Sequence, residues 1–213
     1  MSHNPCMARL LASAVHDMRN ILAIIRESAG LAQDLAQLAK GGDSDRAELS
    51  SSLDEVRRQV LLAVQLAEGL EFIAQADMAG DAASCDLARI CSLFCRMAAR
   101  QARAARIRLA NGQCGEPVWA ATPSMDVFQA LLDVLDLCVS VGGKVELELA
   151  AGQQGGNPGI VLRVAGGDNA ELALSAMTGS SAPGGRSGKR QANLLPGLGP
   201  GSFFLAWQAR EEA

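Results

Sequence analysis

The chain has 213 residues, of which 49% are apolar, 20% are charged and only 3% are aromatic, and it has no tyrosine. This balance is typical of a folded globular protein and excludes an intrinsically disordered chain. The net charge of −4 and the scarcity of aromatic side chains exclude a nucleic-acid partner, which needs a basic footprint and stacking faces. No stretch approaches the roughly 20 consecutive apolar residues of a membrane span, so we expect no membrane partner.

The six cysteines contain no Cys-x-x-Cys pair, which indicates reduced thiols and a cytoplasmic protein. Cys91 and Cys95 are four residues apart on a predicted helix, a spacing that could serve a metal. Neither a histidine nor a second cysteine pair lies near them in the sequence to complete four ligands. The sequence therefore predicts that the cysteines are small core residues and that there is no metal site.

Apolar residues recur in alternating steps of four and three over the first 80 residues. They are Leu11, Val15, Met18, Leu22, Ile25, Ala29, Ala32, Ala36 and Ala39, and then Leu49, Leu53, Val56, Val60, Ala63, Ala67, Leu70 and Ala74. Heptad spacing of this kind is that of helices packed as in a coiled coil. A Gly/Asp-rich loop over 41–45 separates the two segments, so we predict an antiparallel helical hairpin.

Further leucines widen the apolar surface of this hairpin beyond one seam: Leu10, Leu31, Leu35, Leu38, Leu61, Leu62 and Leu66. One hairpin does not bury so much apolar surface alone. Two hairpins paired in a four-helix bundle would cover it, and we therefore predict a homodimer. The alternative is a hairpin that packs only on the second half of its own chain.

His16 stands inside the first helix and is followed by Asp17 and, one turn later, by Asn20. The other histidine, His3, lies in the N-terminal tail. Because His16 follows the seam residue Val15, we expect its imidazole at the flank of the bundle, partly exposed to water. Such an imidazole is a competent nucleophile toward a phosphoryl group, and a neighbouring carboxylate can orient it or accept its proton. The alternative is an ordinary polar residue on a solvated helix face.

The segment His16–Ile25 resembles the H-box of two-component sensor histidine kinases, in which an acid follows the phospho-accepting histidine and Asn or Thr stands four residues on. The resemblance implies that His16 is phosphorylated. It also implies that Asp17 assists the transfer and that Asn20 orients water or the receiver domain of a response regulator. Three further residues would contact that receiver domain: Arg19, Ile21 and Ile24. Many family members have proline at the position of Ile21, so we expect a straighter helix here.

The second half of the chain begins after a linker at 78–84 and predicts two helices. The first spans Leu87 to Ala104, capped by Ser84 or Asp86, and the second spans Ser124–Ser140, opened by Thr122–Pro123 and ended by Gly142–Gly143. Their predicted core residues are Leu87, Ile90, Leu93, Phe94 and Met97, and then Val127, Leu131, Leu132, Leu135 and Val139. The outer side of the first helix is basic, and it is either a solvated face or a surface for an acidic partner. Its basic residues are Arg89, Arg96, Arg100, Arg103 and Arg106.

Alternating apolar residues predict short strands near Ile107–Ala110, Val118–Ala121, Lys144–Leu149, Ile160–Val164 and Ser202–Gln208. Lys144–Leu149 and Ile160–Val164 form an antiparallel hairpin in this prediction. The order of elements resembles the Bergerat-type ATP-binding domain of the same kinases, an α/β sandwich. We therefore expect an α+β protein with a dimerisation and phosphotransfer hairpin at 1–79 and an ATPase-like domain at 80–213.

The residues that bind the nucleotide in that family are poorly matched. In the family, two asparagines four residues apart on a helix hold Mg²⁺ and phosphate, and they align with Asp133 and Leu137 of this chain. A leucine side chain cannot ligate Mg²⁺, which demands oxygen. Asp136 is one residue out of register with the second asparagine. The segment 165–169 lacks a second glycine after Asp168, and 197–201 leads into a strand rather than a helix. A loop at 179–189 either cradles phosphate or is a flexible surface loop, and it lacks Walker A spacing. We expect a degenerate domain that binds no nucleotide.

The whole pattern is similar to ChpT-type histidine phosphotransferases. The resemblance implies a phosphorelay enzyme of two-component signalling that passes a phosphoryl group between response-regulator receiver domains. An upstream hybrid histidine kinase would supply the phosphoryl group and the receiver would supply Mg²⁺. The absence of a sensor segment before His16 fits this expectation. The alternatives are an active or pseudo sensor kinase with a divergent ATP site, and a non-catalytic receiver-binding adaptor or phosphatase.

Overall fold

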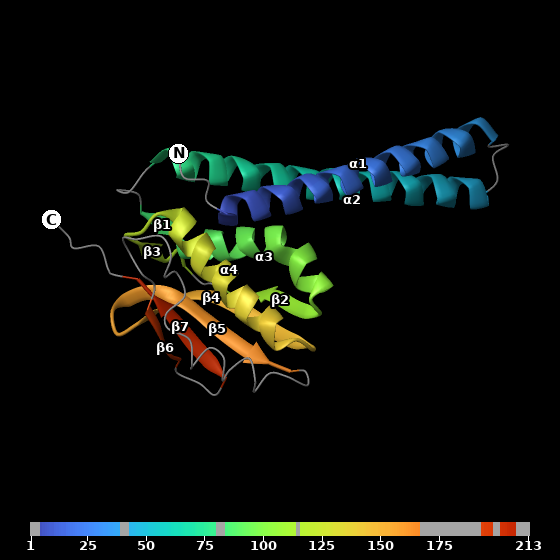
Figure 1. Ribbon diagram of the computed structural model, residues 1–213. Coiled ribbons are helices and arrows are strands. Elements are labelled where there is room, and N and C mark those ends of the chain that lie inside the picture. Colours follow the sequence, from blue (N-terminus) through green and yellow to red (C-terminus); the bar gives the residue numbers. More distant parts are fainter. Residues whose placement is uncertain are drawn as a thin grey trace.

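The computed structural model describes residues 5–38, 43–79, 84–113, 116–166, 193–197 and 201–207. A pair of long helices, α1 and α2, lies on a layer of two shorter helices, α3 and α4, and this layer covers a β-sheet (Figure 1). None of the helices in these ranges is long and apolar enough to span a membrane.

Helices α1 (Pro5–Leu38) and α2 (Asp43–Ala79) form the predicted hairpin. Helix α1 runs without a break through Ile21, as expected for a residue that keeps its backbone N–H. Helix α2 is longer than predicted, because the expected loop residues 43–45 and linker residues 78–79 belong to it. Residues 39–42 and 80–83 lie outside the described residues.

The predicted heptad positions separate into two rows. One row is buried or half-buried: Met18, Ile25, Ala32, Leu49, Val56, Ala63 and Leu70. The other row is exposed, and we call it the exposed heptad stripe: Leu11, Val15, Leu22, Ala29, Ala36, Leu53, Val60, Ala67 and Ala74. A contact between two helices covers only one of the two rows, so the hairpin leaves an apolar stripe unpaired.

Helix α3 (Leu87–Ala104) has the predicted bounds and the predicted core. Its N-cap is Asp86, whose Oδ1 accepts a hydrogen bond of 3.0 Å from the backbone N–H of Ala88. All five residues predicted to face inward are buried. The helix ends before Arg106, which has a left-handed backbone with φ of 62°.

Helix α4 (Ser124–Val141) begins at the predicted residue and runs one residue further than predicted, to the expected stop at Gly142, but its N-cap differs from the prediction. Thr122 does not cap it, because Pro123 occupies the N-cap position and makes no side-chain hydrogen bond. Four of its five predicted core residues are buried, but Val139 is 39% exposed. The prediction for Val139 is wrong because Cys138, three residues after Leu135, takes the inward position in the last turn.

The main sheet has five strands in the order β2-β4-β5-β7-β6. Their bounds are Ile107–Asn111 for β2, Val145–Gln154 for β4, Asn157–Ala165 for β5, Asn193–Pro196 for β6 and Ser202–Ala206 for β7. Strand β2 pairs in parallel with β4, and all other pairs are antiparallel. The predicted β4–β5 hairpin is confirmed and is longer than expected.

Two features of the strands differ from the prediction. Strand β6 was not predicted, since its four residues are too few to show an alternating pattern. The strand expected at 118–121 is only Trp119–Ala120 (β3), and it pairs with Cys85–Asp86 (β1) in a separate two-stranded sheet. This small sheet lies where the chain enters α3 and α4.

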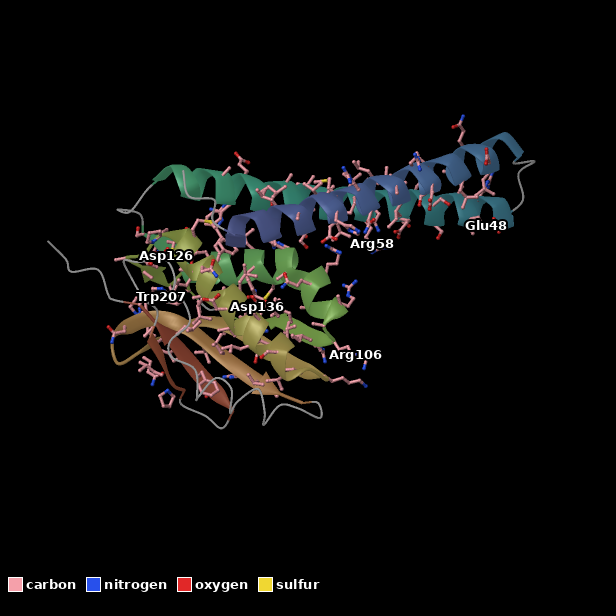
Figure 2. All side chains as sticks on the ribbon, viewed as in Figure 1. Glu48, Arg58, Arg106, Asp126, Asp136 and Trp207 are labelled. Atoms are coloured by element: carbon pink, nitrogen blue, oxygen red, sulfur yellow. The ribbon has the colours of Figure 1, made fainter. Side chains whose placement is uncertain are left out.

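The main core lies between α3, α4 and the sheet (Figure 2). Its largest fully buried side chains include Phe94 and Phe128 from the helices and Leu147 from the sheet. The two phenylalanine ring centroids are 6.3 Å apart. The hairpin joins the same core through Ala14 and Leu66, so the hairpin and the layer below it are packed together.

Replacing Leu135 by alanine will lower the free energy of unfolding by about 2–5 kcal/mol, because a fully buried side chain leaves a cavity. The matched control on the same helix is Val139→Ala, which will change it by less than about 1 kcal/mol. Urea unfolding followed by circular dichroism measures both. Equal losses for the two variants would contradict the assignment of the buried face of α4.

Candidate functional site

The N-terminal half of α1 packs closely against α3. Ser13 and Ala14 are buried at this contact, and Ser13 Oγ donates to the Met97 carbonyl oxygen over 3.4 Å. Small side chains let two helix backbones approach each other. His16 follows at once along α1, and its side chain is 52% exposed. The helix contact therefore places the imidazole at the edge of the junction, where the sequence predicts a partly exposed side chain.

Two polar side chains of the described part of the chain lie beside the imidazole of His16, both at Nδ1. Asn20 Nδ2 is 3.2 Å from His16 Nδ1, one helical turn away, as the spacing predicts. Asp17 Oδ1 is 3.6 Å from the same atom. Neither contact involves Nε2, so these two side chains meet the ring at one nitrogen.

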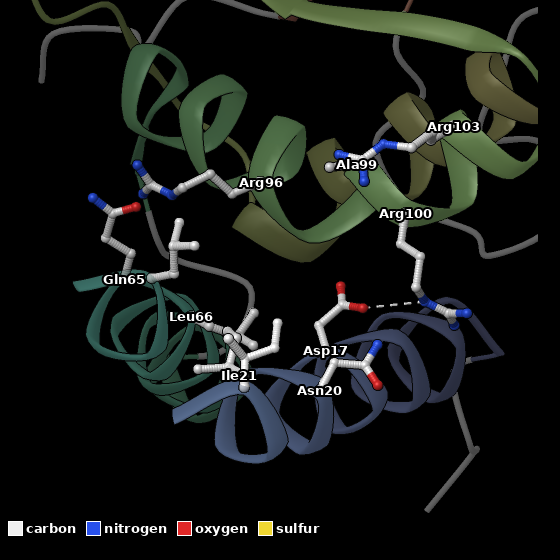
Figure 3. A pocket seen from close by; sticks show the side chains of 11 residues that line it. Asp17, Asn20, Ile21, Gln65, Leu66, Arg96, Ala99, Arg100 and Arg103 are labelled. Carbon is white, nitrogen blue, oxygen red and sulfur yellow. Dashed lines mark ion pairs between the residues drawn. The ribbon is translucent and has the colours of Figure 1, made fainter. Parts of the chain in front are cut away.

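Asp17 also contacts a residue that the sequence did not connect with the site. Arg100 Nε of α3 is 3.2 Å from Asp17 Oδ1, and this ion pair joins the hairpin to the helix layer (Figure 3). Arg100 belongs to the predicted basic face of α3. No sequence signal related that face to α1, because their proximity arises from tertiary packing alone.

A cleft of about 430 Å³ lies between the hairpin and α3, next to His16. The hairpin supplies an apolar wall and α3 supplies a basic one (Figure 3). The lining residues are Asp17, Asn20, Ile21, Ile24, Leu62, Gln65, Leu66, Arg96, Ala99, Arg100 and Arg103. The structure thus brings the predicted contact residues Ile21 and Ile24 together with Asp17 and Asn20. Arg19 is exposed and does not line the cleft.

The arginines on the basic face of α3 lie in two different environments. Its arginines at 89, 96, 100 and 103 are all exposed. Arg96, Arg100 and Arg103 line the cleft, whereas the Arg89 guanidinium stacks on the Phe72 ring, 4.7 Å from its centroid. The end of this face that lies closest to His16 is therefore the part that includes Arg100.

The positions aligned with the family's nucleotide-binding asparagines lie on α4. Asp133 Oδ1 accepts a 2.8 Å hydrogen bond from Gln129 Nε2, and Leu137 is half-buried against the core. Among the described residues there is no group of three or more His, Cys, Asp or Glu that could hold a metal ion. Leu137 offers no oxygen ligand at the position where the family has its second asparagine. Segment 179–189 and most of 165–169 and 197–201 lie outside the described residues.

The four cysteines that the structure describes in detail form no disulfide: Cys85, Cys91, Cys95 and Cys138. Burial raises the pKa of Cys85 and of Cys95 to about 12, and that of Cys138 to about 11. Cys85, Cys95 and Cys138 therefore stay protonated near neutral pH, and a protonated thiol is a poor nucleophile and a poor metal ligand. They act as small core residues.

No protein-family model matches this chain, and no curated protein does. The chain is similar to the Acinetobacter baumannii histidine kinase AdeS (TM-score 0.38, 12% identity, 92% of this chain and 98% of that one). It is also similar to a bacterial phosphotransferase (TM-score 0.35, 13% identity, 98% of each chain). A third similarity is to histidine kinase ThkA in complex with the response regulator protein TrrA (TM-score 0.38, 11% identity, 92% and 59%). All three TM-scores lie below 0.5, so we base the function on the residues of the site.

Native protein will react with diethyl pyrocarbonate at His16, because the ring is half-exposed and Nε2 has no polar neighbour in these contacts. Peptide mass spectrometry will locate the adduct on the peptide that contains His16. In the His16→Asn variant the corresponding peptide will stay unmodified. Protection of His16 in native protein, with modification only after unfolding in urea, would contradict the site geometry.

Proposed function

We propose that this chain is a histidine phosphotransferase that relays phosphoryl groups between the receiver domains of response regulators. The observation that carries the proposal is the half-exposed His16, whose Nδ1 has a carboxylate and an amide beside it and whose Nε2 does not. Nε2 attacks the phosphorus of a receiver phosphoaspartate, the P–O bond breaks, and the aspartate leaves as a carboxylate. The reverse step passes the phosphoryl group to the aspartate of a second receiver.

The receiver docks in this proposal beside His16, where Ile21 and Ile24 line the cleft. Arg19 lies exposed on α1 and contacts the same partner from outside the cleft. The receiver supplies the Mg²⁺ that offsets the phosphoryl charge, and an upstream hybrid histidine kinase supplies the phosphoryl group. Asp17 assists the transfer, and Asn20 orients water or the receiver. This chain contributes the nucleophile and its orientation.

Residues 1–79 form the dimerisation and phosphotransfer domain in this proposal, and 80–213 an ATPase-like domain that does not bind nucleotide. The half-buried Leu137 and the hydrogen-bonded Asp133 favour this role over a sensor kinase with a divergent ATP site. The remaining alternative is an adaptor or phosphatase that binds receivers without taking up phosphate.

The test mixes the protein with a phosphorylated receiver domain and Mg²⁺. We expect acid-labile, base-stable phosphate on the wild-type chain, since phosphoramidates break down in acid and persist in base. His16→Ala will take up none while keeping its fold, because the side chain is exposed.

Two controls separate the alternatives. Labelled ATP with Mg²⁺, in the absence of any receiver, will leave His16 unlabelled, and labelling would show a kinase instead. If no receiver of a panel from the source genome transfers phosphate and His16→Ala stays active in the pathway, the adaptor alternative is correct.

The exposed heptad stripe supports a homodimer. It runs along both helices of the hairpin and includes Leu22, which is 56% exposed, and Val60, which is 45% exposed. Its apolar residues recur with the heptad spacing of a coiled-coil seam, so a second copy of the same stripe is a matching partner. Two hairpins joined there make a four-helix bundle.

Leu22→Glu or Val60→Glu will convert the dimer to a monomer, because each places a charge in the proposed seam. Light scattering after gel filtration measures the mass, which for the wild type will be twice the 22.2 kDa of one chain. The matched control is Leu31→Glu, since Leu31 is equally exposed but lies on the opposite side of α1 from Leu22. A wild-type monomer, or dissociation by Leu31→Glu alone, would contradict the interface.

A further inference from the structure

The basic face of α3 has no role in the phosphotransfer chemistry proposed above. Three of its arginines line the cleft beside His16: Arg96, Arg100 and Arg103. Asp17 is the only carboxylate among the residues that line this cleft, so the lining carries a net charge of +2, although the whole chain carries −4. A positive surface on an acidic protein attracts negatively charged partners to one place.

The three arginines differ in what they already bind. Arg100 Nε is 3.2 Å from Asp17 Oδ1, so its charge is offset within the protein. The Arg96 guanidinium donates to a neutral oxygen, Ser92 Oγ, over 3.1 Å. Within the part of the chain that the structure describes, neither Arg96 nor Arg103 forms an ion pair. These two guanidiniums are therefore available to the carboxylates of a partner.

The opposite wall of the cleft, on the hairpin, is apolar (Figure 3). It includes Ile24, which is 36% exposed, and Leu62, which is 41% exposed. Large aliphatic side chains that remain in contact with water are stabilised when another apolar surface covers them. The cleft thus offers an apolar contact and a positive contact next to each other.

The spacing of the arginines indicates the shape of the negative partner. They lie four and three residues apart, on one face of α3. A helix rises about 1.5 Å per residue, so the row from Arg96 to Arg103 is about 10 Å long. A small anion is bound best where polar groups converge on one point. A row of guanidiniums instead matches several carboxylates spaced along a protein surface, each of which arginine can bind through two N–H groups.

We propose that Arg96 and Arg103 recognise a row of carboxylates on the receiver domain, beside the place where the receiver docks on Ile21 and Ile24. This inference rests on the proposed function, because it names the chemistry of the receiver's contact surface. The apolar wall supplies contact area. The two guanidiniums favour receivers with acidic side chains at this place and disfavour receivers with basic ones. Helix α3 thereby contributes to the choice of partner.

The exposure of the two arginines determines which property of binding they change. Water screens each exposed ion pair, so each one adds modestly to affinity. Their attraction acts before contact and raises the association rate. Salt weakens this attraction, because the screening length falls from about 10 Å at about 0.1 M salt to about 3 Å at about 1 M. The arginines will therefore affect the association rate and its dependence on salt.

The test measures, by surface plasmon resonance, how unphosphorylated receiver domains from the source genome bind the full chain without a phosphoryl donor. For receivers that bind the wild type, the double variant Arg96→Gln/Arg103→Gln will lower the association rate about tenfold at low salt. At about 1 M NaCl the variant and the wild type will associate at similar rates. Arg96→Lys/Arg103→Lys will keep most of the wild-type rate, because it keeps both charges.

Arg89→Gln is the matched control. It removes the same charge from the same exposed face, but Arg89 lies outside the cleft and stacks on Phe72. We expect it to lower the association rate less than about twofold, since distant charges are screened. Thermal unfolding of each variant checks that the fold is intact, as expected for exposed side chains.

The proposal is overturned if no receiver domain binds the wild type, or if the double glutamine variant associates as fast as the wild type at low salt. An equal loss for Arg89→Gln would also overturn it. Inorganic pyrophosphate is the probe for a small-anion site. Calorimetric binding of pyrophosphate that requires Arg96 and Arg103, while receivers bind independently of them, would replace the protein surface with such a site.

The failure of this proposal is distinguishable from the failure of the proposed function, because the binding measurement involves no phosphoryl group. A chain that binds receivers through Arg96 and Arg103 but takes up no phosphate at His16 keeps this surface and loses the proposed function. A chain that takes up phosphate while both arginines are dispensable for association keeps the function and loses this surface.

Discussion

The close contact of α1 with α3 at Ser13 and Ala14 is the constraint on which the site depends. These two small, buried residues join the hairpin to the core beneath it, and Ser13 adds a hydrogen bond to α3. Because His16 and Asp17 follow directly on the same helix, the contact fixes their distance from the arginines of α3. A histidine in the distal half of the hairpin would have no neighbour from the second layer.

The residues of one turn of α1 therefore belong to three different surfaces. Ser13, Ala14 and Asp17 face α3, Val15 belongs to the exposed heptad stripe, and His16 lies between these two faces. In the proposed dimer the imidazole would stand between the bundle seam and the cleft. A receiver that docks there would meet the apolar hairpin wall and the arginines of α3 together, so both layers would contribute to recognition.

Short-range patterns were sufficient to predict most of the helices. The heptads predicted α1 and α2, and the Asp86 cap and the glycines after α4 set the limits of the second layer. The β4–β5 hairpin follows from alternation and β3 lies within the strand expected at 118–121, but β1 and β6 are too short to show a period. Val139 was misassigned because the buried stripe of α4 advances by three residues rather than four at its end.

The site itself was predicted only in part. His16, Asp17 and Asn20 share one stretch of helix, and the spacing of His16 and Asn20 correctly predicted their contact. The ion pair of Asp17 with Arg100 was not predictable, because it joins helices that are distant in the sequence and depends on how the two layers pack. The same packing places Ile21 and Ile24 in the wall of a cleft, whereas the sequence predicted them on an open surface of the hairpin.

The most direct test of the account is the position of the phosphoryl group on the imidazole, measured by ³¹P–¹⁵N coupling in the phosphorylated, ¹⁵N-labelled protein. Asp17 and Asn20 both lie at Nδ1, so the account predicts a single phosphohistidine at His16 with phosphorus bonded to Nε2. Phosphorus on Nδ1, or on a residue other than His16, would contradict it.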